Sequence, residues 1–153
     1  MKKAILAALA GLCLVQAVPA GTDSLSRLFL PGRAVLDLDG DGFPEKPALD
    51  IIVPDKPTAG ELALAADIAA RTNFESLAVD LGLVRRESEV ATRPGPWFSI
   101  YVGANQARVR EALRDRKLDP AAIPPNQGLV FLVTRQDRPG IACVAGSDET
   151  LLK

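Results

Sequence analysis

The chain has 153 residues, the length of one domain, and its 48% apolar and 24% charged residues exclude a disordered chain. The formal net charge is −1, and no basic stripe with interleaved aromatic residues indicates binding to nucleic acid. Histidine is absent, which removes the commonest general base and the commonest zinc ligand.

Residues 1–20 have the features of a secretory signal peptide. A short basic start leads into an apolar run over 4–18, and small residues stand at the −3 and −1 positions of a cleavage site before Gly21. One alternative is an uncleaved anchor, but the run is shorter than the about 20 residues of a membrane span. Another is a lipoprotein lipidated on Cys13, although the bulky Leu12 precedes that cysteine. We therefore expect an exported protein, periplasmic or extracellular, with no stable membrane span after cleavage.

Cleavage would leave Cys143 as the one cysteine of the chain, so no internal disulfide could form. This residue lies in the apolar run 141–145, which predicts a small buried hydrophobe rather than a reactive thiol. A secreted protein without disulfides must be stabilised by its core, by a metal or by neighbouring domains.

An acidic loop is the main feature of the N-terminal segment, residues 21–47. Alternating positions of such a loop present oxygen ligands, the type that calcium prefers. The five predicted ligands are Asp37, Asp39, Asp41, the Phe43 carbonyl and Glu45. Gly40 and Gly42 permit sharp turns, and carboxylates this close repel one another without a counter-ion. We expect a structural Ca²⁺ site, and the alternative is a polar Asx-type turn without metal.

The stretch Asp37–Glu45 resembles the Asp-x-Asp-Gly-Asp-Gly loops of EF-hand-like calcium sites, dockerin modules, thrombospondin-type repeats and FG-GAP repeats. The resemblance covers nine residues and implies a cation site rather than a fold. It departs from an EF-hand because the twelfth position is Ala48 instead of a bidentate Glu, and because Pro44 interrupts the loop. No apolar helical pattern precedes it either. The loop is therefore predicted to connect two strands.

The first half of the remaining chain predicts a βαβ unit near 48–81. The apolar run 48–53 is a strand, and the capping box Thr58-Ala-Gly-Glu61 begins a helix over 59–72. That helix carries apolar residues on more than one face, which predicts burial on two sides or close packing of its alanines on a sheet. Asn73 is the expected C-cap, and residues 74–81 alternate as a second, parallel strand would.

The second half predicts a charged edge or loop, a strand, a helix and a hairpin. In order, these elements cover 83–93, 97–102, 104–118, and 128–134 with 141–145. The helix turns Val109, Ala112 and Leu113 inward and its charged residues outward. Residues 48–153 are therefore expected to form a small α/β (or α+β) domain with a mixed sheet of about five strands and two main helices.

The last residues, Gly146-Ser-Asp-Glu149, predict the first turn of a helix with Ser147 as its N-cap. One turn is too little for a stable helix. Two interpretations follow: 48–153 is the front part of a longer protein, or these residues form a frayed C-terminal turn.

These features favour an exported, non-catalytic accessory or interaction domain with a structural calcium loop. The strand, helix and hairpin pattern over 97–149 resembles small α/β modules that precede catalytic domains in secreted glycoside hydrolases, and also the periplasmic subunit of bacterial cellulose synthase. That resemblance implies a carbohydrate or a neighbouring catalytic domain as the partner. The alternative is the N-terminal fragment of a secreted hydrolase, either a glycosidase or a peptidase.

If the chain is an enzyme, its candidates are paired carboxylates, because no histidine is present. Asp50 with Asp67 or Glu75 would be such a pair, as in glycoside hydrolysis. Nothing in the sequence places these groups the required distance of about 5–10 Å apart. Trp97 and Phe98 could form an exposed binding patch, although their position in a strong strand favours burial in the core.

Overall fold

The computed structural model describes residues 32, 34–76, 79–90, 98–135 and 138–152. The predicted signal peptide and Trp97 lie outside this part of the chain. Its elements in chain order are β1 (Val35–Leu36), β2 (Lys46–Pro47), β3 (Leu49–Val53), α1 (Ala59–Glu75), β4 (Val84–Arg86), α2 (Glu87–Val90), β5 (Phe98–Val102), α3 (Ala107–Asp115), the 3₁₀ turn η2 (Pro120–Ala122), β6 (Gly128–Arg135), β7 (Arg138–Ala145) and α4 (Asp148–Leu151).

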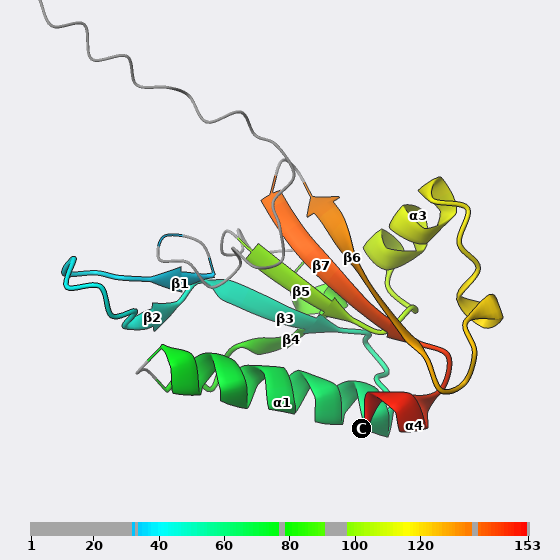
Figure 1. Ribbon diagram of the computed structural model, residues 1–153, viewed down its shortest axis with the longest axis horizontal. Helices are drawn as coiled ribbons and strands as arrows, with labels where there is room; N and C mark the ends of the chain where they lie inside the picture. The colour runs from blue at the N-terminus through cyan, green and yellow to red at the C-terminus, as the bar shows by residue number, and fades with distance from the viewer. Residues whose placement is uncertain (1–31, 33, 77–78, 91–97, 136–137, 153) are drawn as a thin grey trace, which may run out of the picture.

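The centre of the fold is a mixed five-stranded sheet in the order β4-β3-β5-β7-β6 (Figure 1). The first four of these strands run parallel to their neighbours, and β6 pairs antiparallel with β7. Strands β1 and β2 form a separate antiparallel pair. The α/β class, the sheet of about five strands and the two main helices, α1 with 17 residues and α3 with nine, confirm the sequence-based expectation.

Helices cover both faces of the sheet, so its strands alternate between two apolar layers. Ile51, Ile100 and Ile141 lie side by side on the face that α1 covers. Their neighbours Ile52 and Tyr101 lie on the opposite face, where α3 packs with Val109, Ala112 and Leu113, as predicted. Parallel strands buried on both faces have near-continuous apolar sequences, which explains the run Leu49–Val53.

The βαβ unit is present, but its second strand lies later than residues 74–81. Helix α1 continues to Glu75, and Phe74 stands on its surface, 76% exposed. Asn73 is inside the helix rather than at its cap, and its side chain exchanges hydrogen bonds with the backbone of Asp80. The parallel partner of β3 is the short edge strand β4. Phe74, Val79 and Leu81, apolar residues of the predicted strand that the structure describes, are all exposed.

The C-terminal hairpin agrees with the sequence, whereas Ser147 stands before α4 without a capping bond from its side chain, and its hydroxyl donates to the Pro125 carbonyl instead. Strands β6 and β7 form the predicted hairpin, with Gly128 opposite Ala145. Phe98 is buried, and Cys143 is partly buried in the apolar layer under α1. Within the described residues, none of the helices has the length and apolar character needed to cross a bilayer.

Candidate functional site

The acidic loop connects β1 and β2, as the sequence predicts. Val35 pairs with Pro47 and Leu36 with Lys46, so residues 37–45 form the tip of a hairpin. The backbone takes positive φ angles of 80° at Gly40 and 92° at Gly42, conformations that glycine adopts without steric cost. The hairpin extends beyond the end of the five-stranded sheet at which β3 begins (Figure 1).

Hydrogen bonds from the backbone hold the acidic side chains inside the loop. Asp37 accepts from the N–H groups of Gly40, at 2.7 Å, and Gly42, at 2.9 Å. Asp41 accepts from the N–H of Phe43, and Glu45 reaches back to accept from the N–H of Leu38. These bonds orient carboxylates toward the interior of the loop, and they also form the Asx turns that such a sequence can adopt without metal.

The carboxylates of Asp37, Asp39, Asp41 and Glu45 converge. One oxygen from each lies within 4.8 Å of the corresponding oxygens of the other three. Calcium binds oxygen ligands at about 2.3–2.6 Å, so two oxygens on one ion are separated by at most about 5 Å. These four residues could therefore hold one metal ion between them. The Phe43 carbonyl stays a predicted fifth ligand, and the Phe43 side chain is exposed.

A second hollow, of about 220 Å³, lies at the carboxyl edge of the parallel strands. It is lined by residues from the start of α1, from the segment after β5, and from the end of β7 through α4. Its polar lining residues are Thr58, Glu61, Asn105, Ser147 and Asp148. Helices α1 and α3 leave β3 and β5 toward opposite faces of the sheet, and ligands of open α/β sheets bind at such crossover points.

Two carboxylates in this hollow already have partners. The Thr58 hydroxyl and the Gly60 N–H both donate to Asp148, the latter at 3.0 Å. Glu61 closes the capping box predicted from the sequence, accepting from the Thr58 N–H at 2.9 Å while its own N–H donates to the Thr58 hydroxyl. Burial raises the pKa of Glu61, and the nearby Asp148 carboxylate raises it further. The backbone N–H groups at the start of α1, which favour an anion, therefore already bind carboxylates of the protein, those of Glu61 and Asp148.

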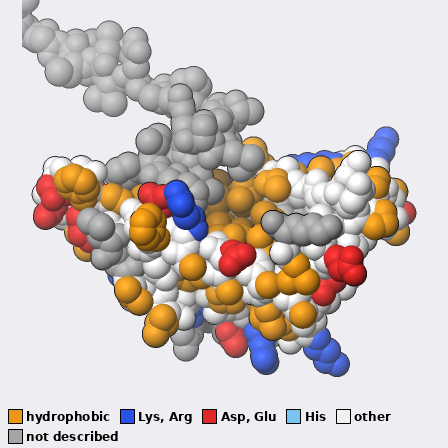
Figure 2. All heavy atoms as spheres, turned by 60° about the horizontal axis from the view of Figure 1, so that its bottom comes forward, with side chains coloured by type: hydrophobic (Ala, Val, Ile, Leu, Met, Phe, Trp, Pro, Cys, Tyr) orange, Lys and Arg blue, Asp and Glu red, His pale blue; other side chains and the backbone are white. Residues whose placement is uncertain are grey.

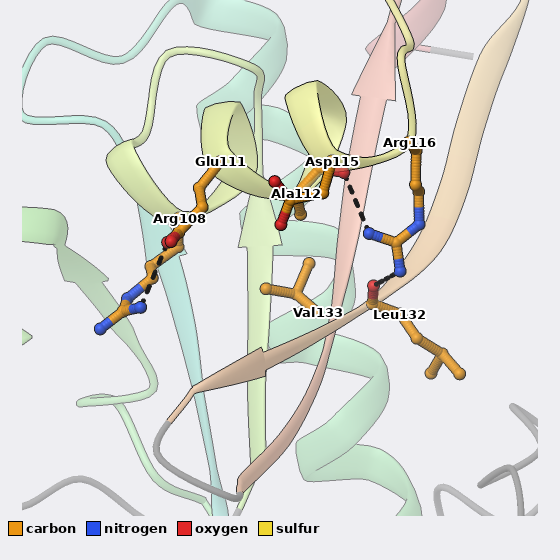
Figure 3. A pocket seen from close by; sticks show the side chains of 7 residues that line it. All are labelled: Arg108, Glu111, Ala112, Asp115, Arg116, Leu132 and Val133. Atoms are coloured by element: carbon orange, nitrogen blue, oxygen red, sulfur yellow. Dashed lines mark hydrogen bonds and ion pairs between the residues drawn. The ribbon is translucent and has the colours of Figure 1, made fainter.

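A third hollow, of about 250 Å³, lies between α3 and β6 (Figure 3). Three of its charged groups bond within the protein: Arg108 pairs with Glu111, and Arg116 donates to the carbonyls of Ala112 and Leu132. The Arg116 guanidinium also stands over the Phe131 ring, 5.3 Å from its centroid. The Arg116 contacts connect the C-terminal end of α3 to β6.

The carboxylates considered for catalysis are not brought together. Asp50 is buried and paired with Arg85 at 2.8 Å. Its neighbours Leu49 and Ile51 face α1, so Asp50 faces the other side of the sheet. Asp67 belongs to α1 and is exposed. The sheet therefore separates Asp50 from both acidic candidates on that helix.

Sequence reasoning did not find the hollow at the carboxyl edge. Its residues come from three segments that are far apart in the chain. The capping box and the predicted helix start at Ser147 were local signals, but neither indicated that these segments meet. Comparison with known proteins adds no further residue, because no protein-family model matches the chain and no curated protein is found to be similar.

Proposed function

We propose that this chain is an exported, non-catalytic accessory or interaction domain whose β1–β2 hairpin binds Ca²⁺ in a structural role. The observation that carries the proposal is the convergence of four carboxylate oxygens within 4.8 Å of one another. Calcium is abundant outside cells, so even a millimolar site would be occupied there. The predicted signal peptide over residues 1–20 is the basis for the exported location.

The hydrogen bonds inside the loop are compatible with this proposal. Each carboxylate offers about four lone-pair positions, and the backbone N–H groups use only some of them. Asp37, which accepts two such bonds, keeps positions for a cation. The same bonds would also stabilise a metal-free Asx turn, so the two states of the loop must be distinguished by measurement.

The non-catalytic part of the proposal rests on the carboxylates. Asp50 is held by Arg85 and faces away from α1. In the hollow between α3 and β6, Arg108, Glu111 and Arg116 are bonded to groups of the protein. The proposed partners are a carbohydrate or a neighbouring catalytic domain. Binding of the chain to an array of glycans would support the first, and its absence would leave the catalytic-domain partner.

Calorimetric titration with Ca²⁺ tests the metal site directly. We expect heat from one site in the wild-type chain and none in Asp37→Asn or Asp41→Asn, each of which replaces a charged ligand by a neutral one. Asp115→Asn, which changes an exposed carboxylate of α3, is the matched control and keeps the wild-type heat. At a calcium concentration tenfold above Kd, binding stabilises the fold by about 1.4 kcal/mol. If the wild type gives no heat with calcium, the loop is a metal-free Asx turn and the proposed site is wrong.

A further inference from the structure

Strand β6 is an edge of the five-stranded sheet, paired with β7 on one side. In an antiparallel ladder, every second pair of residues exchanges hydrogen bonds, and the residues of the other pairs turn their backbone groups away from the partner strand. Pro139 has no N–H, so its pair with Thr134 is not a hydrogen-bonded one. By the same alternation, the backbone N–H and carbonyl groups of Leu132 and Val130 point to the edge rather than to β7.

The sequence of β6 is that of a strand that pairs readily with a like strand. Residues 128–134, Gly-Leu-Val-Phe-Leu-Val-Thr, contain no charge and no proline, and such a segment at a sheet edge is a pairing hazard. Val130 is 51% and Leu132 36% exposed. Their β7 partners, Cys143 and Ile141, lie in the layer under α1, so both are on that face of the sheet. Figure 2, which turns the underside of Figure 1 forward, shows hydrophobic side chains in several places on this side of the molecule.

The side chain of Arg116, the residue after α3, lies on this edge (Figure 3). One guanidinium nitrogen donates to the Leu132 carbonyl at 2.7 Å, and another donates to the Ala112 carbonyl at 3.0 Å. The same group stands over the Phe131 ring, 5.3 Å from its centroid. The carbonyl that a neighbouring strand would need in the middle of β6 is therefore already bonded, and the bond brings a positive charge to an otherwise uncharged stretch.

We propose that Arg116 closes the β6 edge, and that without it two copies of the chain join by antiparallel pairing of β6 with β6. A two-fold axis perpendicular to the sheet relates the two strands, so the contact is the same in both directions. With Phe131 opposite its own copy, Val130 stands opposite Leu132 of the second copy, and both use backbone groups that point to the edge. This register places apolar pairs on both faces of the joined sheet, and it requires the Leu132 carbonyl that Arg116 holds.

Sedimentation velocity of the purified chain at about 100 µM in reducing buffer tests the proposal. The wild type should have the mass of one chain. Arg116→Leu, which keeps an apolar side chain but has no donor, should associate at least about a hundred-fold more tightly. The reason is that both copies of the wild type must give up a hydrogen bond from a charged donor, one of the stronger kinds, before the strands can pair. Arg114→Leu removes an exposed charge from the last turn of α3 and is the matched control, which should stay monomeric.

A second substitution, Val130→Pro, separates pairing through β6 from any other association. Proline at this position removes an N–H that points to the edge, and it leaves the hydrogen bonds between β6 and β7 in place. Added to Arg116→Leu, it should restore the monomer. Amide hydrogen exchange gives an independent readout, because the Val130 N–H should exchange fast in the wild type and slowly in the Arg116→Leu dimer.

Circular dichroism checks that each variant is folded. If Arg116→Leu does not fold, Arg116→Lys takes its place: lysine keeps the charge but lacks the planar fork that reaches two carbonyls, so it should associate more tightly than the wild type, though less than a hundred-fold. An Arg116 variant that is folded and as monomeric as the wild type would overturn the proposal. Association that survives Val130→Pro, or a wild type that already pairs through β6, would overturn it as well.

Discussion

Gly103, at the end of β5, is the residue whose replacement tests the carboxyl-edge hollow most sharply. Its φ of 95° is unfavourable for any residue with a Cβ, and a Cβ at this position would overlap the Glu61 carboxylate, with the Glu61 Cδ only 2.6 Å away. Gly103→Ala therefore carries a conformational cost of about 1–2 kcal/mol. It also displaces the Glu61 side chain from the Thr58 N–H, a loss of about 1 kcal/mol.

The expected destabilisation is thus about 2–3 kcal/mol, read from urea unfolding at constant m-value. Gly32→Ala is the matched control, because Gly32 has a φ of 87° and no atom within 4 Å of the added Cβ. It should lose only the conformational part. In Gly103→Ala combined with Glu61→Ala, the two losses should fall short of additivity by about 1 kcal/mol. Equal losses for Gly103→Ala and Gly32→Ala would refute the contact between Glu61 and this turn.

Three further predictions concern single side chains. Because the pKa of Glu61 is raised above its ordinary 4.5, its contribution is complete at low pH and is lost as pH rises through the folded pKa. As pH rises through this range, the melting temperature of Glu61→Gln should increase relative to that of the wild type. A difference between the two melting temperatures that does not change with pH would contradict this. Asp148→Ala should cost about 1–2 kcal/mol in urea unfolding, since it frees two donors at the start of α1. Burial raises the pKa of Cys143 to about 11, so a thiol reagent at pH 8 should label it about 200-fold more slowly than an ordinary thiol in a Cys13→Ser background.

Features set by neighbouring residues were predictable, whereas features set by distant ones were not. The capping box depends on Thr58 and Glu61, three positions apart, and it begins α1 where the sequence indicated. The end of α1 was misplaced because Phe74 looked like a strand residue, although in the fold it is an exposed helical residue. Strand β4 has two arginines among its three residues, a composition suited to an edge strand but without an apolar signal.

In the candidate sites, too, local features were predictable and long-range ones were not. The spacing of the acidic residues is local, so the sequence could place Asp37, Asp39, Asp41 and Glu45 in one turn. That Asp148 caps α1 from 88 residues away, or that Val130 and Leu132 share a face with Cys143, depends on strand order and register. Such relations arise only when the sheet is assembled, and no local pattern encodes them.

The way the hairpin joins the core determines how calcium would act on the whole domain. A loop on an isolated hairpin could bind the ion without changing global unfolding, because the hairpin could open by itself. Here Ala34 and Val35, at its base, are fully or almost fully buried, and the Ala48 N–H donates to the Ala34 carbonyl at 2.7 Å. Strand β2 also leads into β3 through the single residue Ala48. Opening the hairpin therefore exposes core residues, so calcium heat and a higher melting temperature should occur together, and heat without a thermal shift would mean that the hairpin opens independently of the sheet.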